Sequence, residues 1–493
     1  MRILFVASEL APLAKTGGLG DVCAALPRTL ADLGHDVRVV VPLYSRVRES
    51  QREFATVVPE IEITLGDKRV RFSIASAPLP GTTLPVHFVH CPSLYDRPSI
   101  YTNDTDEHLR FAVLQWAAIK LCQHTGFSPQ IVHCNDWQTA LLPLMLKTVV
   151  AWDRLFAGAR SVLTIHNVGY QGAFPAAALP DTGLLDVADR LHQEQLRAGV
   201  LNCLLTGILH ADAITAVSPS YALEIQTEEH GAGMDRFLRA RAATVYGILN
   251  GIDDAEWSPE RDRFIAQRYS LDDLDGKERN KQELMRAVDL PYDPAAPVIG
   301  IVSRLVAQKG FDLCFDVLPH LLAATRVRLV VLGRGAAKYE GFFSRLARAW
   351  PEQVAFRRGF SDPLAHAIEA GADLFLMPSR YEPCGLNQMY SLRYGTVPVV
   401  HRTGGLADTV RLWHGEGSNG NGFVFDHFDV EGLRWALRYA LATWGDGRGR
   451  QREIWREIQR NGMVEDFSWK SRIGDYVRLY ERLLAPARLA PAP

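Results

Sequence analysis

Lys15-Thr16-Gly17-Gly18-Leu19-Gly20-Asp21 lies between an apolar run at residues 3–7 and a periodic segment at residues 22–30. This order predicts a strand, a glycine-rich loop and a helix. Glycines let the backbone approach a ligand closely, and the free N–H groups at a helix start suit an anion such as a phosphate. The alternative is a tight turn whose glycines serve geometry alone. The stretch matches neither the dinucleotide-binding fingerprint nor the P-loop.

Bulk composition narrows the class of protein. The 493 residues are too many for one ordinary core, so two or more domains are expected. A net charge of −2 gives no global attraction to nucleic acid or anionic membranes, and no apolar run of about 18 residues predicts a membrane span. The seven cysteines are scattered and never spaced as CxxC. This favours a reducing, cytoplasmic location over disulfides or structural zinc.

Two series of alternating strands and helices divide the chain. Short β-branched runs alternate with helical patterns up to residue 252, a polar stretch follows, and a second series continues to residue 466. We therefore predict an α/β protein of two Rossmann-like, doubly wound domains, at 1–252 and 253–466. Ligands of such sheets bind beyond the carboxyl ends of the strands, so the two domains are expected to face an interdomain cleft. A C-terminal helix at 467–484 is predicted to pack back on the first domain, and a tail at 485–493 to be disordered.

The opening stretch has an echo about four hundred residues later. Arg402-Thr403-Gly404-Gly405-Leu406-Ala407-Asp408 repeats the cation, the TGGL and the acid in matching places, again between an apolar and a helical run. Chance is the alternative for any short repeat, but seven aligned positions in matched contexts disfavour it. Two backbone nests with flanking cations, one in each domain, suggest that an anion is held from both sides.

The second domain offers charged groups at strand ends. Arg304 and Lys309 follow its first strand. Two cations in this position are suited to bind a diphosphate. The alternative interpretation is that both are solvated surface charges. Glu382 follows the strand at 373–377, where a carboxylate can accept hydrogen bonds from sugar hydroxyls or stabilise a developing cation. The alternative role for Glu382 is to stabilise the start of the following helix through its interaction with the helix dipole. Cys384 has no visible His/Asp partners and is interpreted as pocket lining.

The first domain offers polar clusters at two strand ends. His166-Asn167 ends one strand, and Asp136-Trp137 follows another. A lone histidine is more often structural, but two such clusters in one domain favour the lining of a ligand site. No group of His, Cys, Asp and Glu has metal-ligand spacing, so neither a metal nor another cofactor is predicted.

These motifs together resemble those of bacterial glycogen synthases and plant starch synthases, from residue 1 to about 484. The segments that carry the resemblance are Lys15–Val22, His166-Asn167, Leu249–Asp253, Ser303-Arg304 with Gln308–Gly310, Glu382–Leu386 and Thr403–Asp408. The resemblance implies the GT-B fold. It also implies a metal-independent, retaining transfer of glucose from ADP-glucose to the non-reducing end of an α-1,4-glucan, either glycogen or maltodextrin.

The resemblance also implies roles for single residues. Lys15 and the Gly17–Gly18 backbone would hold the distal phosphate of ADP, and Arg304 and Lys309 would bind and stabilise the departing diphosphate. The donor glucose would be surrounded by Glu382, Cys384, Gly385, Asn250 and Asp21, with His166 at its reacting face. The nucleotide would be surrounded by Thr403, Gly404, Gly405 and Phe360. The acceptor side would be lined by Glu9, Asp136, Trp137 and Asn167.

Lys277 adds a further match to the family pattern, whereas Phe360 departs from it. Lys277 matches a K-x-x-N-K motif of the family and is a further candidate, with a solvated helix face as the alternative. Phe360 stands where the family usually has Tyr, and keeps the ring that would stack on adenine while losing the hydroxyl. The alternative functions are a UDP-glucose-using retaining transferase, an inactive glucan-binding paralogue and a phosphorylase. A phosphorylase needs a pyridoxal-phosphate lysine, whose context is not recognisable here.

Overall fold

The computed structural model describes residues 1–50 and 53–485, and divides into two compact units. The first unit contains the chain up to Gly251 and again from Trp469 onward, and the second runs from Ile252 to Ser468. Apart from Ala485, the tail predicted to be disordered lies outside the described residues. Each unit is described by itself.

A nine-stranded sheet forms the centre of the first unit, in the order β11-β10-β7-β6-β1-β2-β5-β4-β3. The strands are β1 (Arg2–Val6), β2 (Asp36–Pro42), β3 (Ala55–Leu65), β4 (Lys68–Pro78), β5 (Pro85–His90), β6 (Ile131–Asn135), β7 (Arg160–Ile165), β10 (Ala213–Ala216) and β11 (Val245–Gly247). All neighbours are parallel except the β5-β4-β3 edge, which is an antiparallel meander. The central strands are apolar at consecutive positions because both of their faces are buried.

The helices of the first unit include one that is contributed by the end of the chain. They are α1 (Gly18–Asp32), α2 (Ser45–Arg48), α3 (Pro92–Tyr95), α4 (Glu107–Thr125), α5 (Leu142–Lys147), α6 (Gln193–Arg197), α7 (Cys203–His210), α8 (Pro219–Glu224), α9 (Asp235–Ala240) and α18 (Trp469–Leu484), with a small hairpin of β8 (Ala173–Pro175) and β9 (Val200–Asn202). Helix α18 packs against α1. The Tyr480 hydroxyl lies 2.6 Å from His133 Nδ1, and Thr164 Oγ1 lies 2.6 Å from Nε2 of the same ring. A fully buried histidine thus connects β6, β7 and α18.

The second unit contains a six-stranded, wholly parallel sheet in the order β14-β13-β12-β15-β16-β17. Its strands are β12 (Val298–Leu305), β13 (Arg328–Gly335), β14 (Val354–Arg358), β15 (Leu374–Met377), β16 (Val397–His401) and β17 (Phe423–Phe425). The order reverses after β14, because β15 returns to the other side of β12. Such a switch point places the loops after β12 and β15 side by side at one edge.

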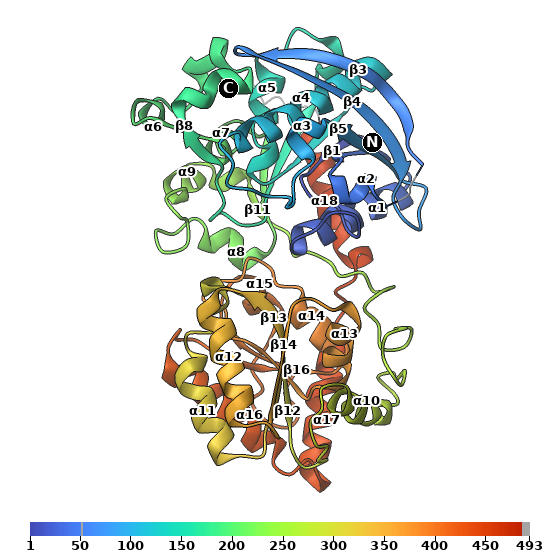
Figure 1. Cartoon of the computed structure of the whole chain (residues 1–493), viewed down its shortest axis with the longest axis vertical. Coiled ribbons are helices and arrows are strands. Elements are labelled where there is room, and N and C mark those ends of the chain that lie inside the picture. Colours follow the sequence, from blue (N-terminus) through green and yellow to red (C-terminus); the bar gives the residue numbers. More distant parts are fainter. Residues whose placement is uncertain (51–52, 486–493) are drawn as a thin grey trace, which may run out of the picture. The chain divides into compact units, whose positions relative to one another are not determined.

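Helices cover both faces of this sheet (Figure 1). They are α10 (Asp275–Ala287), α11 (Cys314–Ala324), α12 (Ala337–Ala349), α13 (Asp362–Gly371), α14 (Asn387–Arg393), α15 (Gly404–Thr409), α16 (Val430–Trp444) and α17 (Gly449–Met463). Ile299 and Ile301 point into the core under α11, α12 and α16, whereas Val298 points into the core under α10 and α13. The alternation along β12 is the expected result of a strand buried on both faces.

Strand β3 and helix α17 are the two longest of the elements that were not expected from the sequence. Strand β3 forms the exposed outer edge of the first sheet, so few of its side chains are buried. Helix α17 is rich in arginine and glutamate, and buries only a narrow stripe that includes Trp455 and Ile458. Both elements lack the strong apolar pattern by which the other strands and helices are recognised.

The structure also bears on membrane spans and cysteines. Within the described residues, no helix combines the length and apolar character needed to cross a bilayer. All seven cysteines are buried and none forms a disulfide.

The buried His133 makes a prediction about acid stability. Burial lowers its pKa to about 3, whereas an unfolded histidine titrates near 6.5. Below pH 6.5 the unfolded chain therefore binds a proton that the folded state does not bind, and stability falls by about 1.4 kcal/mol per pH unit for this group. His133→Gln should reduce the loss of stability between pH 7 and pH 5 by about 2 kcal/mol. Hydrogen exchange of amides in β6 and α18 at the two pH values measures this free energy.

The matched control is His320→Gln on the surface of α11, where the imidazole is 78% exposed. It should leave the pH dependence unchanged. Equal pH dependence in the wild type and His133→Gln would contradict the prediction.

Candidate functional site

In the first unit, polar side chains converge where β1, β6 and β7 end. Asn135, the last residue of β6, donates from Nδ2 to the carbonyl of Val6 at 3.0 Å. Its Oδ1 therefore faces His166 Nε2, 3.0 Å away, just beyond the end of β7. Because Oδ1 only accepts, Nε2 must carry the proton. Burial lowers the pKa of His166 to about 3, so the ring is neutral at pH 7 and its Nδ1 is an acceptor.

Asp136 holds the loop after β7 in place. Its Oδ1 accepts from the backbone N–H of His166 at 2.7 Å and, more weakly, from that of Asn167 at 3.4 Å. Burial raises the pKa of Asp136 to about 7, although these N–H groups oppose the shift. Its backbone has φ of 54° and ψ of −171°, a region that costs a non-glycine residue about 1–3 kcal/mol. Such strain is characteristic of functional sites.

Trp137 follows Asp136 and is nearly buried. Its ring packs edge-on against Phe111 and Phe174, with centroids 5.1 and 5.4 Å away. A Cβ at Gly172 would lie 2.2 Å from this ring, so the indole fills the space that the glycine leaves. Trp137 therefore packs as part of the core beside Asp136.

The glycine-rich loop leads from β1 into α1. The Lys15 ammonium lies 2.9 Å from an Asp21 carboxylate oxygen, and both side chains are substantially exposed. Glu9 holds the loop, because its carboxylate accepts from the N–H and hydroxyl of Thr16 at 2.7 and 2.8 Å. Gly20 is required here, since a Cβ would lie 2.5 Å from the Lys15 Cβ.

The start of α1 itself is open. A Cβ placed at Gly17 would have no atom within 4 Å apart from those of its chain neighbours, and α1 has no side-chain cap among the described residues. Its first N–H groups are therefore available to a ligand.

Asn250 follows β11, at the same edge of the sheet. It is 4% exposed, and within the described part of the chain its Oδ1 has no hydrogen-bond partner. A buried amide oxygen without a donor costs free energy, so a ligand hydroxyl or water would satisfy it.

In the second unit, an ion pair connects the ends of β12 and β15. Lys309 Nζ lies 2.6 Å from Glu382 Oε2, and the Ser379 hydroxyl donates to the same oxygen at 2.9 Å. Glu382 is 6% exposed. Arg304, near the end of β12, is in register with Arg334 on β13. Four charged residues thus lie at or just beyond the ends of neighbouring strands at one edge, and three of them are cations.

The second TGGL copy packs directly beneath Glu382. The N–H of Gly405 donates to the Glu382 carbonyl at 3.1 Å. A Cβ at Gly404 would lie 2.0 Å from the Glu382 carbonyl oxygen, and one at Gly405 would lie 2.0 Å from that of Cys384. The glycines of Thr403-Gly404-Gly405 are therefore needed for close packing against the Glu382–Gly385 segment. In contrast to Gly17, they are not open to solvent.

Two further predicted residues lie at distinct places. Phe360 follows β14 and is 71% exposed, an unusual state for a phenyl ring. Lys277, on α10, is buried, and donates to the carbonyls of Ala370 and Glu369 and to Thr396 Oγ1. These acceptors precede β15 and β16, so Lys277 lies at the amino-terminal edge of the sheet. The structure does not bring it together with Arg304, Lys309 and Glu382, nor does it place it on a solvated face.

Several supporting residues were not predicted from the sequence. Asn135 orients His166, Ser379 holds Glu382, Arg334 stands beside Arg304, and Tyr101 donates to Glu9 at 2.7 Å. Three of them occupy or directly follow strand ends, which is a usable signal. Tyr101 lies far from Glu9 in the sequence, and no sequence pattern indicates that the two residues are in contact.

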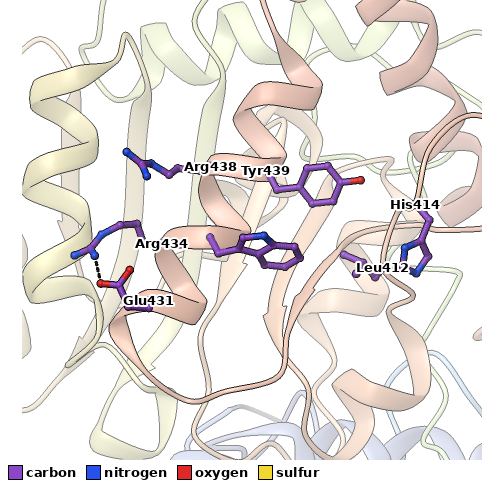
Figure 2. A pocket seen from close by; sticks show the side chains of 7 residues that line it. Leu412, His414, Glu431, Arg434, Arg438 and Tyr439 are labelled. Atoms are coloured by element: carbon purple, nitrogen blue, oxygen red, sulfur yellow. Dashed lines mark hydrogen bonds and ion pairs between the residues drawn. The ribbon is translucent and has the colours of Figure 1, made fainter.

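An open cavity of about 840 Å³ lies away from these residues, beside α16. Figure 2 shows its side chains, with Arg434 paired to Glu431 on the same helix. Its lining includes none of the predicted site residues. Among the described residues, no group of three or more His, Cys, Asp or Glu side chains could hold a metal ion.

Two family models match the two halves of the chain. The model described as "Starch synthase catalytic domain" matches residues 2–240, and "Glycosyl transferases group 1" matches residues 287–461. The chain is 44% identical to a glycogen synthase of Koribacter versatilis (strain Ellin345), covering all of both proteins. It is 46% identical to one of Anaeromyxobacter dehalogenans (strain 2CP-1 / ATCC BAA-258), covering 99% of this chain and 100% of that protein.

Solved structures agree with this assignment. The catalytic domain of starch synthase IV from Arabidopsis thaliana, bound to ADP and acarbose, superposes with a TM-score of 0.90 at 32% identity, covering 98% of this chain and 99% of that one. A sucrose-phosphate synthase from Thermosynechococcus elongatus, at 15% identity and a TM-score of 0.61, shares the fold. The two Rossmann-like units with their parallel sheets have the GT-B fold, and the chain belongs to the glycogen synthase and starch synthase family of glycosyltransferases.

Proposed function

We propose that this chain is a glycogen synthase that transfers glucose from ADP-glucose to the non-reducing end of an α-1,4-glucan, with retention of configuration. The observation that carries the proposal is the Lys309–Glu382 pair, 2.6 Å apart, in the same edge of the sheet as Arg304. Family membership supports the reaction class, and the ADP in the related starch synthase structure supports the nucleotide.

The reaction breaks the bond between C1 of glucose and the diphosphate, and forms one between C1 and O4 of the acceptor. Negative charge develops on the departing ADP. We assign its stabilisation to the cations Arg304 and Lys309, which need no metal ion for this role. Glu382 holds the Lys309 ammonium in position and is itself fixed by Ser379 and the Gly405 N–H. A preorganised charge of this kind is more effective than one that must reorient during the reaction.

The remaining donor contacts are assigned to backbone groups and to the first unit. Lys15, with the open N–H groups at Gly17 and Gly18, would bind the distal phosphate. The Cys384–Gly385 backbone and Asn250 Oδ1 would bind hydroxyls of the donor glucose, with Asp21 fixing Lys15. Thr403, Gly404 and Gly405 would act mainly by supporting Glu382.

His166 is assigned to the reacting face of the donor. Its neutral ring can accept a hydrogen bond at Nδ1 from a sugar hydroxyl, because Nε2 is already bonded to Asn135. Glu9, Asp136, Trp137 and Asn167 would shape the acceptor side. Retention then follows from attack on the same face that the diphosphate leaves, with a phosphate oxygen accepting the acceptor proton. The seven buried cysteines, none of them in a disulfide, fit a cytoplasmic enzyme.

Donor choice is tested directly. Purified enzyme should incorporate glucose into glycogen from ADP-glucose with a much higher kcat/KM than from UDP-glucose. Radiolabelled donor and precipitation of the polymer give both rates. A clear preference for UDP-glucose would overturn the donor assignment, and binding of maltodextrin without turnover of either donor would indicate an inactive paralogue.

Removal of the cations should slow the chemical step. Arg304→Ala and Lys309→Ala should each lower kcat by about 100-fold or more, as expected for the loss of one preorganised charge-stabilising group. Lys15→Ala should do the same. The matched control is Arg326→Ala, which removes a guanidinium 78% exposed just before β13. Near-normal rates in the three variants would contradict the assigned roles.

The exposed Phe360 ring tests nucleotide stacking. Phe360→Ala should raise the KM for ADP-glucose by about tenfold, because stacking on a nucleobase contributes about 1–3 kcal/mol. Phe360→Tyr keeps the ring and should leave KM nearly unchanged. Steady-state kinetics with saturating glycogen separate the two, and equal KM values for all three proteins would remove Phe360 from the site.

A further inference from the structure

A second concave site lies at the amino-terminal edge of the second unit's sheet. It is a cavity of about 210 Å³ lined by residues of α10, of α17 and of the end of α16. Helices α10 and α17 lie close together in Figure 1. An ion pair between Arg456 of α17 and Asp275 of α10 connects two of its walls. The lining residues are Leu274, Lys277, Glu278, Lys281, Tyr292, Pro294, Asp373, Trp444, Gly447, Arg448, Arg452, Trp455, Arg456 and Gln459.

Three buried hydrogen-bond donors line this cavity. Trp444 and Trp455 are 7% and 2% exposed, and neither indole N–H has a hydrogen-bond partner in the described chain. Their rings are nearly perpendicular, with centroids 5.1 Å apart, so at most one N–H can point at the other ring. Lys281 is 2% exposed, and its ammonium pairs with Asp373 at 2.8 Å and lies 4.9 Å from the centroid of the Trp444 ring. At least one of its three N–H groups is left without an acceptor. Buried donors normally have an acceptor, so this set indicates a missing one.

The charges around the cavity are mainly positive. Arg448 directly precedes α17 and Arg452 lies in its first turn, both at the rim of the cavity. Among the described residues the Arg448 side chain forms no hydrogen bond or ion pair, and Arg452 forms only a loose pair with Asp275 at 3.6 Å. The acids are already engaged: Glu278 accepts from the Tyr292 hydroxyl, and Asp373 accepts from the Val298 N–H at 2.8 Å as well as from Lys281. Lys277 is also satisfied by its three acceptors.

We infer that this cavity binds a phosphate group, either as inorganic phosphate or as part of a phosphate monoester. A phosphate offers only acceptors to the indole N–H groups and the ammonium, and its oxygens match the fork of an arginine at the rim. A single water does not fit the site as well, because it would bring two donors of its own to a wall of donors. The volume is several times the ~30 Å³ share of one water, so a larger group is accommodated.

The site is independent of the proposed function. Arg304, Lys309 and Glu382 lie at or beyond the carboxyl ends of β12 and β15. Asp373 directly precedes β15 and accepts from the Val298 N–H at the beginning of β12, and Lys281 of α10 pairs with it there. Phosphate bound here would therefore contact none of the groups assigned to the donor. Its position, at the junction of α10, α17 and the start of β15, would fasten two helices to the sheet.

Calorimetric titration of the full-length enzyme with inorganic phosphate tests the inference. We expect millimolar or tighter binding that persists in Arg304→Ala, where the other phosphate-binding edge is weakened. The double variant Arg448→Gln/Arg452→Gln should weaken the affinity by about tenfold or more, as for the loss of charge-assisted hydrogen bonds. Trp455→Phe removes one buried donor and keeps most of the ring, and should also weaken binding. Titration with glycerol phosphate then distinguishes a monoester from the free ion.

The matched control is Arg450→Gln on the same helix, whose guanidinium pairs with Glu416 at 3.0 Å outside the cavity. It should bind phosphate as the wild type does. Since Arg448 and Arg452 lie at the rim, their double variant keeps the test valid even if Trp455→Phe folds poorly. The inference is overturned if the wild type does not bind phosphate, or if binding disappears in Arg304→Ala and is unaffected in the double variant.

Discussion

The parallel alignment of strands is the constraint on which both units depend. Parallel neighbours end at the same edge, so residues far apart in sequence become neighbours without any contact being specified between them. Asn135 and His166 meet because β6 and β7 are adjacent, and Lys309 meets Glu382 because β15 returns beside β12. The same geometry gives each sheet an opposite edge, where the strands begin. In the second unit, the buried Lys277 and Lys281 of α10 lie at that edge.

The two copies of the TGGL sequence show how one motif can serve two purposes. In the first, Gly17 is open and the helix that follows presents unoccupied N–H groups. In the second, Gly404 and Gly405 allow the backbone to touch the Glu382 segment, and an N–H is used inside the protein. The second copy needs glycines because a side chain would clash within the fold, whereas the space beside Gly17 is open and leaves room for a ligand.

Much of the architecture could be predicted from the sequence, because consecutive β-branched residues reveal strands buried on both faces. The candidate residues at strand ends followed from the same pattern. Strand β3 and helix α17 could not be predicted, since mostly exposed elements carry little periodic signal. The position of Lys277 could not be predicted either: its motif identifies a helix, but which edge of the sheet that helix approaches depends on tertiary packing. The proton on His166 Nε2 required the orientation of the Asn135 amide.

The last helix has a consequence for how this chain acquires its structure during synthesis. Residues 252–468 are inserted into the first unit, whose helix α18 is contributed by the end of the chain. A growing polypeptide can complete the second unit as soon as Ser468 has emerged from the ribosome. The sheet of the first unit is translated earlier. The unit is nevertheless completed later, because the contact between His133 and the Tyr480 hydroxyl forms only after Tyr480 has been synthesised. The order of translation and the order of completion are therefore reversed.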